Sequence, residues 1–142
     1  MILEIYRIKL QSKLIYGNYD ITKIPNPTKN NIIEDAKAFE KWRLEEHKNN
    51  PDFRINNNIM LVNSTLMMLK RYLMIKCDII EFNKFKVVDL YMKNNPPYVD
   101  EELFDFIEKS LCNEDIITDK DALKKFIQSH DKLTRVINKI TL

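Results

Sequence analysis

Four side chains in this sequence have the soft or imidazole donors that a zinc site prefers: His47, Cys77, Cys112 and His130. A zinc site usually takes some of its ligands from closely spaced pairs, such as two cysteines separated by two residues. The four donors here are scattered along the chain, and neither cysteine belongs to a C-x-x-C pair. We therefore expect the two thiols to be small buried hydrophobes, and we expect no metal or other cofactor.

One local pattern nevertheless points to metal-dependent hydrolysis. His130-Asp131 resembles the central dipeptide of HD-type metal phosphohydrolases, and His47 would supply the earlier histidine of that pattern. The pattern also needs a later aspartate, and none follows Asp131. A metal-dependent hydrolase is therefore a remote alternative. The ordinary interpretation of His130 is a histidine packed on the apolar stripe of a helix.

The near-absence of glycine disfavours nucleotide chemistry. The chain has one glycine, Gly17. A Walker loop, a dinucleotide-binding G-x-G-x-x-G and a G-x-S-x-G nucleophile elbow each require at least two. Glycines are needed there because the backbone must turn sharply and approach phosphate groups closely. The sequence therefore predicts a protein that is not an enzyme.

Charge is unevenly distributed in the C-terminal third. Residues 100–119 carry eight acids against one base, although the whole chain has a formal net charge of +2. Four of the acids fall on two turns of one predicted helix: Glu101, Glu102, Asp105 and Glu108. Paired carboxylates can bind a divalent ion, but an acidic face at a helix N-terminus is commoner because it complements the helix dipole. We expect these acids, with Tyr16 and Tyr19, to form a protein-binding surface.

The basic residues allow a different function, nucleic-acid binding. Helical spacing places four bases on the outer half of the last helix: Lys124, Lys132, Arg135 and Lys139. A second basic region in residues 70–93 contains Lys70, Arg71, Lys76, Lys84, Lys86 and Lys93. If the basic helices around 70–93 and 120–139 converged, they would follow a phosphate backbone. Most of these bases are lysine, however, and arginine is the residue that reads base edges best.

The N-terminal residues alternate between apolar and polar side chains. From Tyr6 to Tyr16 the apolar side chains fall mainly on one parity, which is the period of a half-buried strand. Gly17-Asn18 follows, and a second short run then ends at Ile24. This pattern predicts a β-hairpin over residues 1–24. A helix over residues 2–16 that ends at Gly17 is the alternative.

The rest of the chain predicts helices. Asn31 with Glu34 resembles a capping box, and it should begin a helix that ends before Pro51. A second helix is expected from about Ile59 to Lys76. That segment is apolar on most faces, so it should be the central helix of the fold.

The C-terminal half should add further helices. Residues 78–93 have no clean period, and we assign them to a helix. Asp100 should cap a short helix, and Thr118 with Asp121 should begin the last one, whose apolar stripe includes His130. The predicted fold class is mostly α (α+β). It is a compact single domain of four to five helices with an N-terminal β-hairpin.

The amino-acid composition indicates the kind of genome that encodes the protein. Isoleucine, lysine and asparagine are frequent while alanine is scarce, which indicates an AT-rich genome such as that of a phage or a DNA virus. Charged residues near the N-terminus argue against a secretory leader, and no uncharged run is long enough for a membrane span. We expect a cytoplasmic accessory or regulatory protein that binds a larger host or viral protein assembly. The sequence is also compatible with a homo-oligomer.

Overall fold

The computed structural model describes residues 23, 25–50, 58–112 and 120–142, and these residues form a compact helical domain. Its five helices are α2 (Lys29–Asn49), α3 (Asn58–Lys76), α4 (Lys84–Lys93), α5 (Glu101–Leu111) and α6 (Lys120–Thr141). No strand occurs within the described ranges. The hairpin predicted for residues 1–24 lies almost entirely outside them and stays a prediction. None of the five helices has the length and the apolar run needed to cross a membrane.

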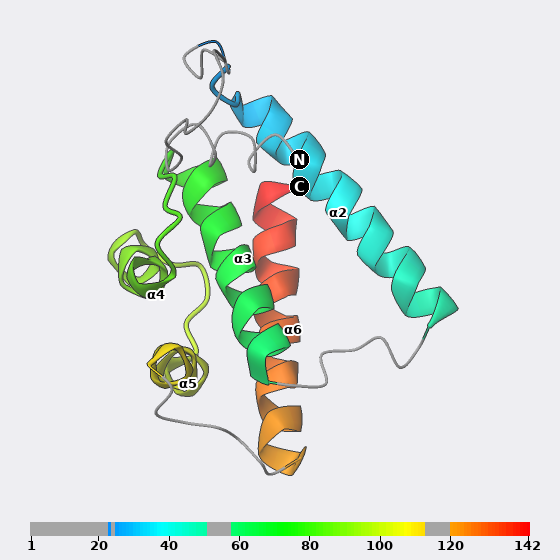
Figure 1. Ribbon diagram of the computed structural model, residues 1–142, viewed down its shortest axis with the longest axis vertical. Helices are drawn as coiled ribbons and strands as arrows, with labels where there is room; N and C mark the ends of the chain where they lie inside the picture. The colour runs from blue at the N-terminus through cyan, green and yellow to red at the C-terminus, as the bar shows by residue number, and fades with distance from the viewer. Residues whose placement is uncertain (1–22, 24, 51–57, 113–119) are drawn as a thin grey trace, which may run out of the picture.

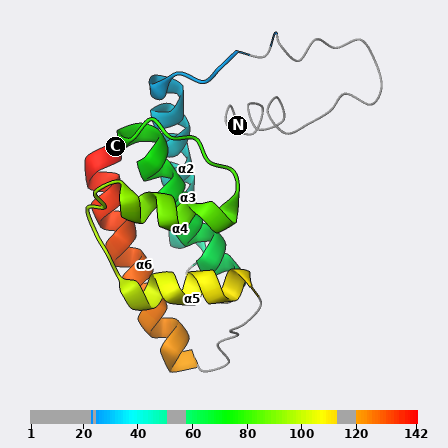
Figure 2. The same ribbon diagram turned by 90° about the vertical axis from the view of Figure 1, so that its left-hand side faces the viewer.

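The helices are arranged around α3 and α6. These two helices lie side by side and run in the same direction, while α2 runs the opposite way on one flank (Figure 1). On the other flank α4 and α5 lie across them, as Figure 2 shows. The central place predicted for the helix near residues 59–76 is therefore confirmed. This arrangement gives α3 two different flanks.

The flank of α3 that faces α4 and α5 is closed by apolar side chains. Leu69 and Leu73 of α3 are fully buried, as predicted from their helical spacing. Tyr91 of α4 is also fully buried, and its ring makes edge-on contacts with Tyr72 and Phe104 at centroid distances of 5.2 and 5.7 Å. The Tyr91 hydroxyl donates to the carbonyl of Tyr98 at 2.8 Å, so the ring is buried without an unpaired polar atom.

α2 begins two residues earlier than the sequence predicts. Its N-cap is Thr28, whose Oγ1 accepts from the backbone N–H of Asn31 at 3.2 Å. The Asn31 side chain in turn accepts from the backbone N–H of Thr28 at 3.1 Å. This reciprocal pair is a capping box in which Asn31 takes the place usually held by Glu or Gln. Asn31 is thus the third residue of the helix and not its start.

The helix assigned to residues 78–93 is wrong for its first six residues. α3 ends through Asp78, which has a left-handed φ of 56°, and the N–H of Ile79 donates to the carbonyl of Leu73 at 3.0 Å. A left-handed residue directly after a helix is a common helix stop, and that position normally holds glycine. α4 begins only after Asn83, whose side chain accepts from the N–H of Phe85 at 3.0 Å. Two capping signals thus separate α3 from α4.

The start of α5 follows the prediction, but its end does not bury a cysteine. The Asp100 side chain caps the helix by accepting from the N–H of Leu103 at 3.0 Å. Cys112 is the C-cap of α5 and is exposed, while Cys77 follows the end of α3 and is partly buried. The expectation of two buried thiols is therefore wrong for Cys112, which lies at an exposed helix end, while Cys77 packs against the core but is only partly buried.

Candidate binding groove

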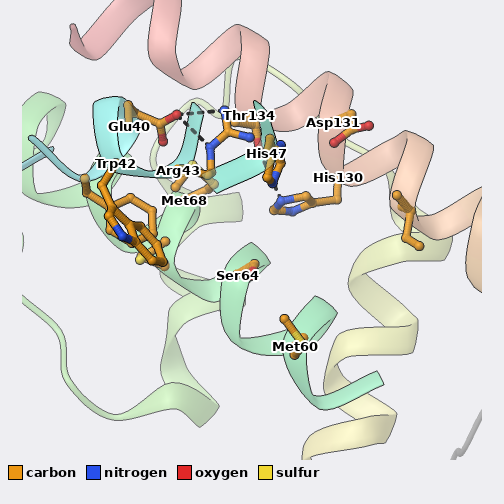
Figure 3. A pocket seen from close by; sticks show the side chains of 13 residues that line it. Glu40, Trp42, Arg43, His47, Met60, Ser64, Met68, His130, Asp131 and Thr134 are labelled. Atoms are coloured by element: carbon orange, nitrogen blue, oxygen red, sulfur yellow. Dashed lines mark hydrogen bonds and ion pairs between the residues drawn. The ribbon is translucent and has the colours of Figure 1, made fainter. Parts of the chain in front are cut away.

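A groove with a volume of about 440 Å³ lies between α2, α3 and α6 (Figure 3). Six apolar side chains line it: Phe39, Trp42, Met60, Met67, Met68 and Ile127. Its polar lining comes from all three helices and includes Arg43, Ser64, His130 and Thr134. A mainly apolar concavity of this size with a few convergent polar groups is typical of a binding site.

The groove exists because α2 leaves the core halfway along its length. Its buried residues are Ile32, Ala36 and Glu40, which are four residues apart and so lie on one face. None of residues 41–49, all of which the structure describes, is buried. Figure 1 shows this C-terminal half of α2 diverging from α3 and α6. The divergence leaves an open wedge on the flank of α3 that faces α2.

Two aromatic side chains of α2 stand on this wedge. The rings of Phe39 and Trp42 are 5.6 Å apart and tilted by 45°. Trp42 is 46% exposed although it lines the groove. Leu44 is 54% exposed and does not line the groove, which makes it a useful reference position on the same helix.

A buried ionic network joins α2, α3 and α6 at the groove. Arg71 of α3 is 4% exposed, and its Nη1 donates to Glu40 Oε1 at 3.2 Å and to Asn138 Oδ1 at 2.6 Å. Arg43 reaches the other oxygen of Glu40 with Nε at 2.9 Å and Nη2 at 2.8 Å. Burial lowers the pKa of the Arg71 guanidinium, and the carboxylate of Glu40 opposes that change. Arg71 therefore does not belong to an exposed basic region, and its inclusion there is wrong.

His130 lies at the floor of the groove as a neutral side chain. The Thr65 hydroxyl donates to the carbonyl of Leu61 at 2.8 Å, so Thr65 Oγ1 must accept from His130 Nδ1, 3.1 Å away. This leaves Nε2 as the acceptor, which faces Thr134 Oγ1 at 3.4 Å. Burial lowers the pKa of His130 to about 4; Arg43 adds to this effect, while Asp131 and Glu40 oppose it. Both ring nitrogens thus face hydroxyl groups.

The residues of the HD-like pattern reach the same groove without forming a metal site. His47 of α2 and His130 with Asp131 of α6 all line it. Within the described residues, however, no three His, Cys, Asp or Glu side chains are grouped so that they could hold a metal ion. The threonine contacts of His130 account for its placement as a packed histidine on the apolar stripe of α6.

The predicted acidic surface lies elsewhere, on α5. All four of its acids are exposed: Glu101, Glu102, Asp105 and Glu108. Glu102 forms an ion pair with Lys125 of α6, and Asp105 pairs with Lys109 at 2.7 Å. Two of these carboxylates therefore already have basic partners within the molecule. Tyr16 and Tyr19, predicted to belong to the same surface, lie outside the described residues.

The four predicted bases of α6 share one exposed stripe. Lys124, Lys132, Arg135 and Lys139 are all exposed, and at 3.6 residues per turn they span an arc of roughly 80°. The buried Leu133 and Ile137 lie on the opposite side of the helix. This grouping agrees with the spacing of the four residues in the sequence.

The second basic region, in residues 70–93, is only partly exposed. Lys93 pairs with Asp89 at 2.7 Å, and Lys70 donates to the carbonyl of Phe82 at 3.3 Å. Arg71 is buried in the network with Glu40 and Asn138. One base of this region is thus buried and two have local partners, while Lys76, Lys84 and Lys86 are exposed.

Comparison of the chain with protein-family models, with curated proteins and with solved structures finds no match. The groove is therefore the main guide to function. Sequence reasoning did not find it, because its walls come from three helices that are distant in sequence. One signal was visible: Trp42 lies on the border of the apolar stripe of its helix and not at its centre.

Proposed function

We propose that this protein is a non-enzymatic accessory protein that binds another protein through the groove between α2, α3 and α6. The observation that carries the proposal is Trp42, which is 46% exposed above a lining of methionines. Tryptophan is enriched among the residues that dominate binding energy, and methionine adapts its shape to different apolar partners. The composition favours a phage or viral regulator that acts in the cytoplasm of its host.

The polar groups around the groove support binding more than catalysis. His130 has threonine hydroxyls at both ring nitrogens, and Glu40 is held by two arginines. A general base or a nucleophile needs a polar atom that can reach a substrate. These groups instead contact one another, so the surface offered to a partner is mainly the apolar one.

The test is capture of partners from an extract of the cells that naturally make the protein. Three tagged forms are compared: the unmodified protein, Trp42→Glu, and the matched control Leu44→Glu on the opposite face of α2. We expect a partner that is retained by the unmodified protein and by Leu44→Glu and is lost with Trp42→Glu. Equal retention by both variants contradicts groove binding, provided that both unfold at the temperature of the unmodified protein.

The basic stripe of α6 favours a second candidate function, nucleic-acid binding. Its four exposed bases would neutralise phosphates, and affinity would then fall steeply with salt because counterions are released. A gel-shift titration at physiological salt tests this function. Charge reversal of Lys124, Lys132, Arg135 and Lys139 should abolish binding, and charge reversal of the four α5 acids should not. Retention that is weak and unaffected by the basic set contradicts this second function.

A further inference from the structure

We infer that the groove accepts an amphipathic α-helix of a partner protein, with acidic residues along the edge that lies beside α6. This inference rests on the proposed protein-binding function and names the chemistry of the partner. It depends on the shape of the groove, on its apolar lining and on the charges at one border.

The shape of the groove fits a helix. From Met60 to Met68 the lining of α3 extends over roughly 12 Å, which is about two helical turns. The C-terminal half of α2 diverges from α3 and α6 (Figure 1), and among the described residues the groove lies along this divergence. A small molecule is usually enclosed over most of its surface, whereas a groove with an open side accepts a helix that inserts one face.

Because the groove has a mainly apolar lining, the partner helix should have an apolar face. Phe39 and Trp42 on one wall face the methionines of α3 across the groove, as Figure 3 shows for Trp42 and Met68. A partner helix does not have to form hydrogen bonds with the floor of the groove, because His130 already faces Thr65 and Thr134. Side chains spaced three and four residues apart on a partner helix would fill this lining.

The border formed by α6 combines one acid, Asp131, with two bases, so its net charge is positive. Asp131 lines the groove, and Lys124 and Arg135 lie seven residues before it and four residues after it, on the same edge of the helix. Both bases are exposed, and Arg135 Nε donates to the backbone carbonyl of Asp131 and not to its carboxylate. On the opposite wall, Arg43 is paired with Glu40, a carboxylate that it shares with the buried Arg71. Acids on the partner helix would therefore meet their complement beside α6.

A second copy of this chain does not supply such a helix from α5. That helix is acidic and amphipathic, but its apolar face is buried in its own core through Leu103, Phe104, Phe106 and Ile107. Presenting this face to another molecule would require α5 to leave the core. The acidic amphipathic helix therefore has to come from a different protein.

The experiment uses three synthetic helical peptides of about 18 residues that contain no tryptophan. They share one leucine face and differ only at the edge positions, which are all Glu, all Lys or all Gln. Trp42 is the only tryptophan of the chain, so its emission reports occupation of the groove directly. We expect a blue shift of that emission, and a Kd for the Glu peptide roughly tenfold lower than for the Lys peptide.

Two charge variants complete the test. Lys124→Glu/Arg135→Glu should remove the preference for the Glu peptide, and Lys86→Glu on α4 should keep it. If all three peptides bind with equal affinity and cause a blue shift, the partner helix does not need acidic residues at its edge. Binding of a helix in the groove is then still supported. Absence of any shift overturns the helical occupant, while the capture experiment with Trp42→Glu still decides the proposed function. A blue shift on self-association, or displacement of the Glu peptide by a DNA duplex, also overturns the inference.

Discussion

On one flank of α3, Tyr91 is fully buried and its hydroxyl is bonded to a backbone carbonyl. On the other flank, Trp42 is 46% exposed, and the buried side chains behind it include charged and hydroxylated ones. Both flanks use aromatic and aliphatic residues, so the amount of apolar surface does not distinguish them. The difference lies in packing: α4 and α5 bury large apolar side chains against one flank, whereas only the N-terminal half of α2 has buried residues on the other. If the groove binds a partner as proposed, stability and recognition lie on opposite sides of one helix.

The largest loss of stability is expected from the buried ion pair between Glu40 and Arg71. Arg71→Ala leaves the buried carboxylate of Glu40 without its interhelical partner, and removing one partner of a buried ion pair typically costs about 3–5 kcal/mol. Urea unfolding of the purified variant measures this loss. If instead the loss is below about 1 kcal/mol, the network does not hold α2 against α3.

A double variant separates charge burial from simple loss of packing. Glu40→Leu/Arg71→Met replaces both charges by apolar groups, which is often neutral for a buried pair. We expect its free energy of unfolding to recover most of what Arg71→Ala loses. A double variant as unstable as Arg71→Ala would show that the charges themselves are required.

The next prediction compares the loss of stability caused by one substitution in the core and one on the groove. Leu69→Ala removes a fully buried side chain and should lower the free energy of unfolding by about 2–5 kcal/mol. Met67→Ala lies on the groove and is only partly buried, so its loss should be about 1 kcal/mol or less. Equal losses at the two positions, measured by urea unfolding, would mean that the groove is packed like the core.

The third prediction concerns pH. His130 has a pKa of about 4 in the folded protein, below its ordinary 6.5, so the unfolded chain takes up the proton first. The stabilising contribution is complete above pH 6.5 and is lost as the pH falls towards 4. Linkage gives a loss of about 3 kcal/mol between pH 7 and pH 4 from this side chain.

Carboxyl groups throughout a protein also bind protons at low pH, so a variant without the imidazole is the reference. His130→Gln should lose less stability than the unmodified protein over the same pH range. The difference between the two curves, measured by thermal or urea unfolding, isolates His130. Parallel curves would indicate that the histidine titrates normally and that the floor of the groove is wet.

The smallest effect is expected at the turn that leads from α3 to the closed flank. Asp78 has a left-handed φ of 56°, so Asp78→Ala should cost about 1 kcal/mol. Asp78→Gly should be neutral or stabilising by up to about 1 kcal/mol, because glycine accepts this conformation. Thermal unfolding of both variants measures the difference, and identical melting temperatures would argue against backbone strain at this turn.

The parts of the fold that depend on local patterns were predictable from the sequence. Leu69 and Leu73 revealed a buried helix by their spacing, and Asp100 revealed a helix start by its capping chemistry. The end of α3 at Lys76 was predicted, but the non-helical residues 78–83 after it were missed, because Asp78 occupies a position where glycine is the usual signal and the chain has only one glycine.

The candidate site was not predictable because its contacts are distant in sequence. Arg71 follows Lys70, and its neighbours in the sequence do not distinguish it from an exposed base. Only its contacts with Glu40 and Asn138, 31 and 67 residues away, show that it is buried. The basic stripe of α6 was found correctly because it follows from the geometry of a single helix.

The same two sequence separations have a consequence for the order of folding. Arg71 gains its partners only after α2 and α6 have both docked on α3, and long-range contacts of this kind form at a high cost in loop-closure entropy. We therefore expect the ionic network to be absent from the folding transition state. Substitutions at Arg71 should then accelerate unfolding and leave the refolding rate almost unchanged, whereas Leu69→Ala should slow refolding. The lifetime of the folded protein would thus be set by its charged flank, and the rate at which it forms by its apolar one.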